Sequence, residues 1–575
     1  MKKTMILSAI ILSLALIVSG CGKINTASGG ESTDSISTAD TSGMEFGFDS
    51  DDTTASSADS GKAVNLSDSD STYQITSGGN YTLSGTKTDT MVLIDAADAD
   101  VNLILNGVTI QNSAGPAIYV RSADKVTITL AAGTTNTLSD GSSYSITDNN
   151  STLDAAVFSK ADLTVNGSGA LTVNGNYKHG IVSKDDLIIA SGTITVSAKN
   201  VGLNGKDCVK IGSGTVKITA GSDGIRSDNT EDTQKGYVYL AGGTVTITAG
   251  NDGIQAETVI NAEAVALTVT AGGGSSASLS SSSESYKGLK AGSDIYIKGG
   301  TFTINSKDDC IHSNGTVTIE GGTYTLSSGD DGIHADTDLA ISGSSTKLTV
   351  TKSYEGLEAT NLYIKGGTIS VTASDDGLNA AGGGDSSAQG GRPGMGSFSS
   401  STGKIVISGG NTTIRQGGDG VDANGSISIT GGTVTVSGAN SGDTSILDFD
   451  STGTISGGTF IGTGAASMAQ NFSTSTTQGA ILYCCSTQSA DTEIKLTDSS
   501  GKVVLSHTAD QAFSCVILSN ASIVSGGTYT LTIGSTSDTI TLSGTTYSNG
   551  SGGMGGGNMG GGGFGGGMGG RGGRP

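Results

Sequence analysis

The sequence predicts an all-β fold, a right-handed parallel β-helix with about 22 residues per turn, from two repeated motifs. The first is a short acidic segment, found at 307–313, 329–335, 353–359 and 374–380. Two residues in the same phase, Cys310 and Gly332, lie 22 positions apart. The second is a Gly-Gly-Thr triplet followed by apolar residues that alternate with Thr or Ser, as at 299–304 and 321–326. A fixed period is typical of solenoids, and the alternation indicates half-buried strands.

One position, most often glycine, marks the phase of the turns. It is occupied by Gly180, Gly202, Gly224, Gly253, Gly288, Cys310, Gly332, Gly356, Gly377 and Gly420. Most spacings are close to 22 residues, and the longer ones indicate insertions such as the Gly- and Ser-rich stretch 382–401. The 93 Gly and 3 Pro among 575 residues suit many tight turns, because glycine adopts positive φ without strain. The alternative solenoid, a calcium roll of nonapeptide repeats, has a much shorter unit.

The start of the chain predicts the compartment. Lys2 and Lys3, an apolar run, and the sequence Val-Ser-Gly-Cys ending at Cys21 indicate a bacterial lipoprotein signal peptide over 1–20. We therefore expect lipidation at Cys21 and a place on the extracellular face of the cell membrane, with the lipid as the only membrane contact. An ordinary signal peptide followed by a chance cysteine is the alternative.

Composition divides the rest of the chain into four parts. Residues 21–62 are polar and are expected to form a disordered tether. The repeats place the β-helix over 63–467, and 470–547 are expected to form a small β module that covers its open end. Residues 548–575 are a Gly-rich, low-complexity tail, expected to be disordered. Cys484, Cys485 and Cys515 share the C-terminal module, where one disulfide is compatible with an extracellular protein.

Acidic residues precede the phase position in most turns and should form a row along the solenoid. This position holds Asp223, Asp252, Lys287, Asp309, Asp331, Glu355, Asp376 and Asp419, and a second acidic residue stands before it at Asp308, Asp330 and Asp375. Residues in phase stack about 4.8 Å apart, where two like charges repel by roughly 3.5 kcal/mol at an effective dielectric constant of 20. A hard cation such as Ca²⁺, which accepts about six to eight oxygen ligands, removes this repulsion. The alternative, favourable Asp-Gly turn chemistry, accounts less well for the doubled Asp.

The Gly-Gly-Thr strands, the Asp-Asp-Gly-Ile turn at 330–333, the lipoprotein signal and the Gly-rich tail together resemble a known family. They are similar to the bacterial cell-surface carbohydrate-binding domain-containing proteins, and the resemblance covers about 65–547. It implies a polysaccharide-lyase-like β-helix with bound calcium, associated with cellulose and with acidic plant polysaccharides such as pectin. Residue by residue, it implies calcium ligands at Asp308, Asp309, Asp330, Asp331, Glu355, Asp375 and Asp376. Lys287 departs from the acidic pattern and is expected to end the row.

We therefore expect a non-catalytic, calcium-dependent polysaccharide-binding lipoprotein that is monomeric. The candidate polysaccharide contacts are Lys287, Lys307, Tyr296 and Tyr363. The two tyrosines are included because they share an outward strand position with Tyr239. The net charge of −23 argues against a nucleic-acid partner, and the absence of Trp argues against a flat aromatic platform for crystalline cellulose.

Two other functions stay open. One is a calcium-dependent pectate lyase, which needs a base beside the metal; the candidates are Lys287, Lys290, Lys307, Arg226, His312 and His334. The other is a structural or adhesive surface protein without glycan specificity.

Overall fold

The computed structural model describes residues 36, 38–69, 71–149, 151–278, 284–380, 402–442 and 444–550. Residues 37–575 form one compact unit, to which the features below belong. Strands dominate the described residues, in which the only α-helix is the single turn α1 (Ser50–Thr53), beside two 3-10 turns at Ala58–Ser60 and Leu66–Asp68. No helix in these ranges is long and apolar enough to span a bilayer. The predicted signal peptide, Cys21, and the tail from residue 551 lie outside the described residues.

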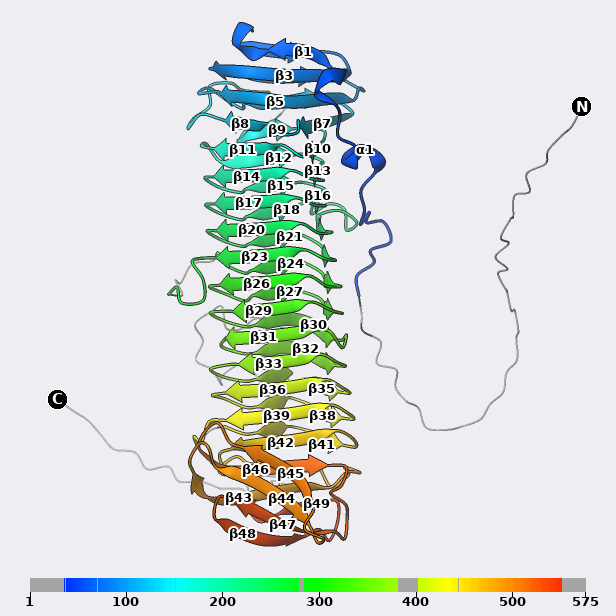
Figure 1. The fold of residues 1–575 in the computed structure, drawn as a ribbon, viewed down its shortest axis with the longest axis vertical. Helices are drawn as coiled ribbons and strands as arrows, with labels where there is room; N and C mark the ends of the chain where they lie inside the picture. Colours follow the sequence, from blue (N-terminus) through cyan, green and yellow to red (C-terminus); the bar gives the residue numbers. More distant parts are fainter. Residues whose placement is uncertain are drawn as a thin grey trace, which may run out of the picture. The chain divides into compact units, whose positions relative to one another are not determined.

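Three columns of parallel strands build a tube (Figure 1), because each strand pairs with the strand one turn later, as β11 does with β14 and β14 with β17. The first column contains β8 (Thr135–Ser139), β11 (Ala170–Gly175), β14 (Thr193–Ala198), β17 (Thr215–Ala220), β20 (Thr244–Ala249), β23 (Ala266–Ala271), β26 (Thr301–Ser306), β29 (Thr323–Ser327), β31 (Lys347–Lys352), β33 (Thr368–Thr372), β36 (Asn411–Gln416), β39 (Thr433–Gly438) and β42 (Thr459–Gly464). This pairing confirms the predicted parallel β-helix.

The second and third columns hold the shorter strands of each turn. The second contains β9 (Ala155–Ser159), β12 (His179–Ser183), β15 (Leu203–Gly205), β18 (Ile225–Ser227), β21 (Ile254–Ala256), β24 (Leu289–Ala291), β27 (Ile311–Ser313), β34 (Leu378–Ala380), β37 (Val421–Ala423) and β40 (Leu447–Phe449). The third contains β10 (Asp162–Gly167), β13 (Asp186–Ile189), β16 (Cys208–Ile211), β19 (Tyr237–Leu240), β22 (Ile260–Ala262), β25 (Ile295–Ile297), β28 (Val317–Ile319), β35 (Lys404–Ile407), β38 (Ser426–Ile429) and β41 (Thr452–Ile455). Two longer strands, β30 (Ile333–Ile341) and β32 (Leu357–Ile364), belong to both columns.

The first turns of the tube use seven further strands. They are β1 (Lys62–Asn65), β2 (Thr72–Ile75), β3 (Gly79–Thr88), β4 (Met91–Asp95), β5 (Val101–Gln111), β6 (Ile118–Ser122) and β7 (Lys125–Leu130). Their pairing is parallel as well, so the tube begins with β1, close to the expected start.

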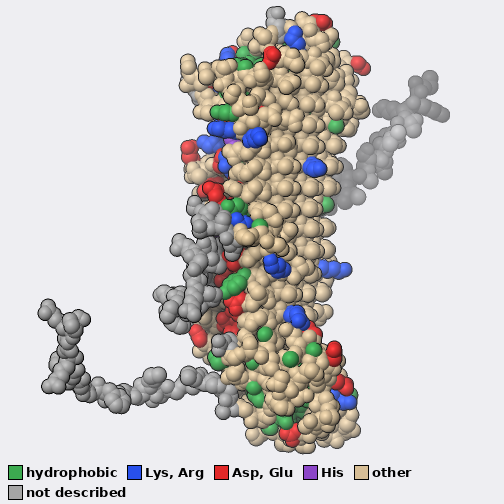
Figure 2. All heavy atoms as spheres, turned by 90° about the vertical axis from the view of Figure 1, so that its left-hand side faces the viewer, with side chains coloured by type: hydrophobic (Ala, Val, Ile, Leu, Met, Phe, Trp, Pro, Cys, Tyr) green, Lys and Arg blue, Asp and Glu red, His purple; other side chains and the backbone are tan. Residues whose placement is uncertain are grey.

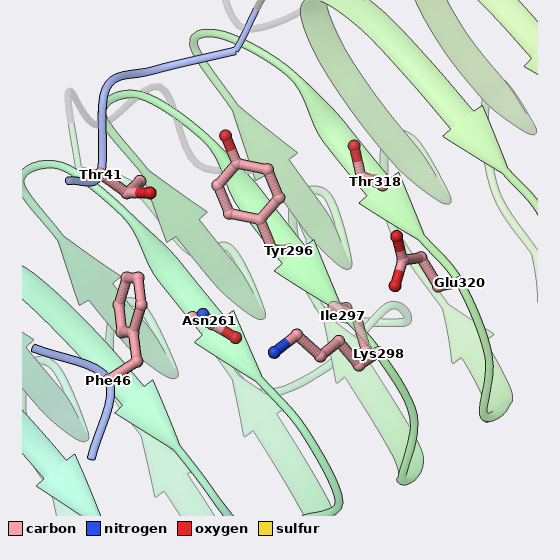
Figure 3. Close-up of a pocket in the computed structure, with 8 residues that line it drawn as sticks. All are labelled: Thr41, Phe46, Asn261, Tyr296, Ile297, Lys298, Thr318 and Glu320. Atoms are coloured by element: carbon pink, nitrogen blue, oxygen red, sulfur yellow. The ribbon is translucent and has the colours of Figure 1, made fainter. Parts of the chain in front are cut away.

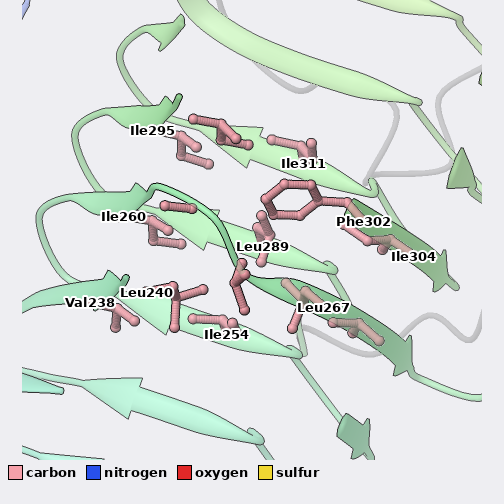
Figure 4. Packing of buried hydrophobic residues seen from close by; sticks show 14 of the residues in the cluster. Val238, Leu240, Ile254, Ile260, Leu267, Leu289, Ile295, Phe302, Ile304 and Ile311 are labelled. Carbon is pink, nitrogen blue, oxygen red and sulfur yellow. The ribbon is translucent and has the colours of Figure 1, made fainter. Parts of the chain in front are cut away.

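Alternation along the strands sends apolar side chains into the tube. In β26, Phe302 and Ile304 are buried, whereas Thr301 and Thr303 face outward. The ring of Phe302 stacks on that of Tyr324 one turn later, with centroids 4.9 Å apart. Figure 4 shows such side chains from successive turns packed inside the tube. Each fully buried side chain of this size stabilises the fold by roughly 1.5–3 kcal/mol, and the stack repeats this gain in every turn.

Two kinds of glycine shape a turn. The second glycine of Gly-Gly-Thr has positive φ, 110° at Gly300 and 103° at Gly322, which only glycine adopts readily. The phase glycine is needed for space instead: a Cβ on Gly288 would lie 2.3 Å from Cγ2 of Ile304 and 2.4 Å from the carbonyl oxygen of Cys310. Close packing of successive turns, and not a positive φ, therefore explains why most turns have glycine at the phase position.

Residues 38–56, here called the N-terminal strap, run along the third column of strands (Figure 1). Met44 is buried there, and Phe46 and Phe48 pack against Tyr239, with ring centroids 5.6 and 5.9 Å away. Lys125 donates a 2.6 Å hydrogen bond to Asp52, which anchors the strap further along the tube. Within 21–62, expected to be a disordered tether, three large apolar side chains interrupt the polar stretch. Met44 is buried and Phe46 and Phe48 are half-buried against the tube, so this described part is docked.

The C-terminal module continues the first column and covers its last strand. It contains β43 (Ala480–Gln488), β44 (Glu493–Asp498), β45 (Val503–Thr508), β46 (Phe513–Asn520), β47 (Thr528–Ile533), β48 (Thr536–Thr541) and β49 (Thr546–Ser548). β46 pairs antiparallel with β42 on one side and β43 on the other. Cys484 and Cys515 face each other with sulfur atoms 3.5 Å apart, and both are free thiols in this structure, although the sequence is compatible with one disulfide in this module.

Candidate functional site

Two neighbouring columns of polar side chains follow the turns that connect the first and second strand columns. The residues before the phase position form a row that we call the Asp ladder: Asp223, Asp252, Lys287, Asp309, Asp331, Glu355, Asp376 and Asp419, one per turn as the backbone hydrogen bonds show. Two positions after the phase residue stand Arg226, Gln255, Lys290, His312, His334, Glu358, Asn379, Asp422 and Asp448, in register across the second column. Acidic side chains gather along one edge of the tube in Figure 2.

Each ladder aspartate binds the backbone of the next turn. The backbone N–H of Asp331 donates to Oδ1 of Asp309 at 2.9 Å, and that of Lys287 donates to Oδ1 of Asp252 at 2.7 Å. The N–H of Asp419 donates to Oδ1 of Asp376 in the same way, at 2.5 Å. Turn chemistry, the alternative considered above, therefore explains one oxygen of each carboxylate. Only the second oxygen is left for other partners.

In the middle of the ladder, basic side chains of this protein satisfy that second oxygen. Nζ of Lys287 donates to Oδ2 of Asp309 at 2.7 Å and lies 3.1 Å from Asp308, while Nδ1 of His312 is 2.8 Å from the same Oδ2. Burial alone would raise the pKa of Asp309, but Lys287 and His312 outweigh it and hold the pKa below its usual range. Asp309 is therefore ionised and fully paired.

A buried histidine neutralises the next turn. Nδ1 of His334 lies 2.6 Å from Glu358 and 3.4 Å from Asp331, and its Nε2 lies 3.0 Å from Asp336. Burial lowers the pKa of His334, but the surrounding carboxylates raise it well above its usual value. Because both ring nitrogens face carboxylates, His334 is an imidazolium. Its ring stacks on that of His312, with centroids 4.8 Å apart.

Further along the tube the cations stop while the carboxylates continue. We call Glu355, Asp376, Asp419, Asp422 and Asp448 the acidic end; all five are half-buried. Within the described part of the chain, none of the five forms an ion pair with Lys, Arg or His. Burial, followed by repulsion from neighbouring carboxylates, raises the pKa of Asp376 to about 7, of Asp419 to about 6 and of Asp422 to about 8. Carboxyl groups without a cationic partner are thus concentrated here, and in the absence of a cation they tend to retain protons.

An amide oxygen without a donor lies within the acidic end. Asn379 is 5% exposed, and its Nδ2 donates to Glu355 at 2.6 Å. Its Oδ1 is buried and meets no hydrogen-bond donor among the described residues. Its neighbours in register are Glu358 and Asp422. An amide oxygen among acceptor-only carboxylates is the type of ligand set that Ca²⁺ prefers.

The predicted calcium ligands divide between these two regions. Oxygens of Asp308, Asp309 and Asp330 lie within 4.8 Å of one another, and Asp331 forms a similar group with His334 and Glu358. Lys287 and His334 already offset these charges, so an added cation fits less well there.

Glu355, Asp375 and Asp376, by contrast, lie at or beside the acidic end. Gly418 leaves space between two of these carboxylates: a Cβ at Gly418 would lie 2.3 Å from Oδ1 of Asp375 and 2.4 Å from Oδ1 of Asp376. At this end the carboxylates stand without the basic partners that the middle of the ladder has among the described residues.

The predicted polysaccharide contacts have different surroundings. Lys287 and Lys307 are only 5% and 6% exposed, and the ammonium of Lys307 lies 3.7 Å from the ring centroid of Tyr286. Little of either lysine is left for a polysaccharide to contact. Tyr296 is half-buried at a pocket beside the strap, whereas Tyr363 is buried. The register of the third column confirms that both tyrosines share one strand position with Tyr239.

Sequence reasoning overlooked Asp422, Asp448 and Asn379 as members of the site. The signal was present for Asn379 and Asp422, which stand two positions after the phase residues Gly377 and Gly420, as His312 and His334 do after theirs. For Asp448 it was absent, because Ile446 occupies the phase position of that turn. It also overlooked Asn261, which occupies the position of Tyr239 and Tyr296 on the turn between them.

Comparisons with known proteins identify the family of the chain. A family model described as "Carbohydrate-binding domain-containing protein" matches residues 69–332 and 315–397. A carbohydrate-binding domain-containing protein of Acetivibrio thermocellus is 38% identical over 133 residues, which are 23% of this chain and 42% of the relative. The chain thus spans less than half of that relative's length. A solved structure of a polysaccharide lyase-like protein from C. thermocellum, a gadolinium derivative, is 37% identical, with 40% of this chain and 87% of that chain covered and a TM-score of 0.35.

Proposed function

Because the chain belongs to the family of carbohydrate-binding domain-containing proteins, we propose that it binds an acidic polysaccharide, such as pectin, through Ca²⁺ and does not cleave it. Asp376, Asp419 and Asp422 would hold the ion together with Oδ1 of Asn379. These side chains offer oxygen ligands, and Ca²⁺ takes about six to eight of them. Uronate carboxylates of the polysaccharide would supply the remaining ones. Cellulose, which carries no carboxylate, is the second polysaccharide to test.

The observation that carries this proposal is the unpartnered Oδ1 of Asn379 among unpaired carboxylates. A buried polar oxygen is nearly always satisfied in a folded protein. Carboxylates with raised pKa values repel one another unless a cation or protons intervene. One ion answers both requirements, and the carboxylates are exposed enough for a ligand to reach it.

The non-catalytic part of the proposal rests on the partners of the candidate bases. The ammonium of Lys287 is held by Asp308 and Asp309. Arg226 lies 3.5 Å from Asp223 and 3.3 Å from Asp228. A general base must accept a proton from its substrate at hydrogen-bond distance, and side chains held as cations by carboxylates are poorly suited to this task. His334 is an imidazolium for the same reason.

Calorimetry on the full chain tests the proposal. Ca²⁺ is titrated first, and oligogalacturonate is then titrated in Ca²⁺ or in EDTA. We expect the wild type to bind Ca²⁺ and to bind oligogalacturonate only when Ca²⁺ is present. The variant Asp376→Asn/Asp422→Asn should lose both. The control Asp95→Asn/Asp228→Asn removes the same charge from ion pairs outside the acidic end and should keep both.

Three outcomes would contradict the proposal. Binding of oligogalacturonate in EDTA would show that calcium is not needed. Unchanged Ca²⁺ binding by the double variant would show that the ion binds at another site. A rise in ultraviolet absorbance from unsaturated products during incubation with polygalacturonate would favour the lyase.

We also propose that Cys21 carries the lipid anchor at the cell surface, as the signal sequence indicates. In a bacterial host, the wild type should sediment with membranes and be accessible to added protease on intact cells. The variant Cys21→Ala should lose membrane association, and an unchanged distribution would contradict the anchor.

A further inference from the structure

A pocket of about 290 Å³ lies between the N-terminal strap and the third column of strands, away from the turns that carry the Asp ladder. The strap contributes Thr41 and Phe46, and strands β22, β25 and β28 contribute Asn261, Tyr296 and Thr318. Figure 3 shows Phe46 and Tyr296 on either side of Asn261. The volume is close to the lower limit of small-molecule sites, about 300 Å³, which suits one or two sugar rings rather than a larger ligand.

The floor of the pocket offers a hydrogen-bond acceptor without a partner. Asn261 is 5% exposed, and its Oδ1 is buried and meets no donor in the part of the chain that the structure describes. Asn261 is in register with Tyr239 on one side and Tyr296 on the other. Since buried polar atoms are almost always satisfied, the unpaired oxygen indicates a donor from outside the chain, such as a hydroxyl group.

The two aromatic walls are fixed in place. Phe46 packs against Tyr237 and Tyr239, with ring centroids 5.4 and 5.6 Å away. The hydroxyl of Tyr296 donates to Asp294 at 2.7 Å, and the same carboxylate accepts a hydrogen bond from the backbone N–H of Ala39 in the strap. Rings held this firmly lose little freedom when a ligand binds between them.

The charges at the rim select against an anionic ligand. Lys298 and Glu320 line the pocket with opposite charges, and the ammonium of Lys298 already lies 2.8 Å from Glu263. A uronate carboxylate would find no uncompensated cation here. A ligand with an apolar ring face and several hydroxyl groups would pack against the two aromatic rings and satisfy Asn261.

We propose that this pocket binds one neutral pyranose residue of a glycan, with its ring beside Phe46 and Tyr296 and a hydroxyl group donating to Oδ1 of Asn261. The inference rests on the proposed glycan-binding function but uses a different face and needs no metal. The subsite forms only when the strap is docked, because Phe46 supplies one of its walls. A single chain would then recognise uronate at the acidic end and neutral sugar at the strap.

Saturation-transfer NMR and calorimetry on the full chain in EDTA test this, with cellotetraose, mannotetraose and galactotetraose as probes. We expect at least one to bind the wild type. Phe46→Ala and Asn261→Leu should each weaken that binding about tenfold, the effect of losing one good contact. Phe48→Ala is the matched control, because Phe48 packs on Tyr239 without lining this pocket. Asn261→Asp keeps an acceptor oxygen and should retain binding.

Thermal melting accompanies each variant, so that loss of binding is interpreted only where the melting midpoint is preserved. The calcium-site variant Asp376→Asn/Asp422→Asn should bind the neutral probe as the wild type does, which separates this inference from the calcium proposal. If oligogalacturonate binds in Ca²⁺ but none of the neutral probes binds, this inference is overturned and the calcium proposal stands. Equal binding by wild type, Phe46→Ala and Asn261→Leu would overturn it as well.

Discussion

Asp309 serves two neighbours at once. Its Oδ1 accepts the backbone N–H of Asp331 in the next turn, and its Oδ2 accepts a hydrogen bond from Lys287 of the previous turn. The side chain is fully buried. The carboxylate therefore joins three successive turns, and its contribution belongs to stability rather than to binding.

The variant Asp309→Ala should lower stability by about 3–5 kcal/mol, the usual effect of removing one partner from a buried ion pair. Asp309→Asn keeps an oxygen for the N–H of Asp331 and should lose less. The comparison uses thermal unfolding midpoints, with Asp228→Ala, a change at a more exposed carboxylate paired with Arg226, as the control. Equal midpoints for Asp309→Ala and Asp309→Asn would contradict the role of the backbone hydrogen bond.

The sequence indicated the phase of Asp309 but not its partners. Spacing alone predicted which residues stack, because a small residue marks the phase of most turns. It could not predict that Lys287, 22 residues earlier, points its ammonium at Asp308 and Asp309 rather than at solvent. That outcome depends on burial, which the sequence pattern does not encode. Lys287 was expected to end the row, and instead it neutralises part of it.

At the scale of elements, the turns around β34, β37 and β40 carry the unpaired carboxylates. The folded pKa values of about 7 for Asp376 and about 8 for Asp422 exceed the unfolded value of about 3.9. Between pH 4 and 8 the folded state therefore binds more protons than the unfolded state, so stability falls as the pH rises. Ca²⁺ should reverse this loss, because it takes the place of the protons.

In EDTA, the melting midpoint of the wild type should drop as the pH is raised from 5 to 8. Added Ca²⁺ should raise the midpoint much more at pH 8 than at pH 5. The variant Asp376→Asn/Asp422→Asn should show a flatter pH profile and little response to Ca²⁺. A calcium effect of equal size at both values of pH would show that these carboxylates are not the ligands.

The C-terminal module is the element that closes the tube. Ile517 in β46 is fully buried where this strand pairs with both β42 and β43. Ile517→Glu places a charge in that interface and should expose the paired edge of β42, an open template for association. We expect larger species in size-exclusion chromatography with light scattering. Val503→Glu, at a side chain 50% exposed in β45, is the control and should stay monomeric.

The strap shows why composition alone led to the expectation of a disordered tether. Residues 21–62 have the overall polarity of a disordered tether, yet Met44, Phe46 and Phe48 are enough to bury part of the segment against Tyr237 and Tyr239. An average over the segment hides three apolar residues at alternating positions. The aromatic partners lie in β19, about 190 residues later, and no local pattern connects the two.

Over the whole molecule, the turn side of the tube changes charge along its length. From the N-terminal to the C-terminal turns, the basic residues come first, at Arg226, Lys287 and Lys290. The stacked histidines follow, and the acidic end comes last. The cations are already paired with carboxylates of this chain, so an anionic chain lying along these turns would need metal ions. The net charge of −23 makes the metal important for such a partner, because an unscreened acidic surface repels a polyanion.

A tube built of stacked turns should respond to calcium locally. Each turn contacts only its neighbours, so stabilisation of one turn spreads through nearest-neighbour interfaces and fades with distance. Hydrogen exchange followed by mass spectrometry should therefore slow on addition of Ca²⁺ in peptides covering β34, β37 and β40, and should stay unchanged in those covering β4, β6 and β9. With Asp376→Asn/Asp422→Asn the slowing should disappear. Uniform slowing along the tube would mean that calcium acts on one cooperative unit, and the ion would then stabilise the whole solenoid rather than equip one end of it to hold a polysaccharide.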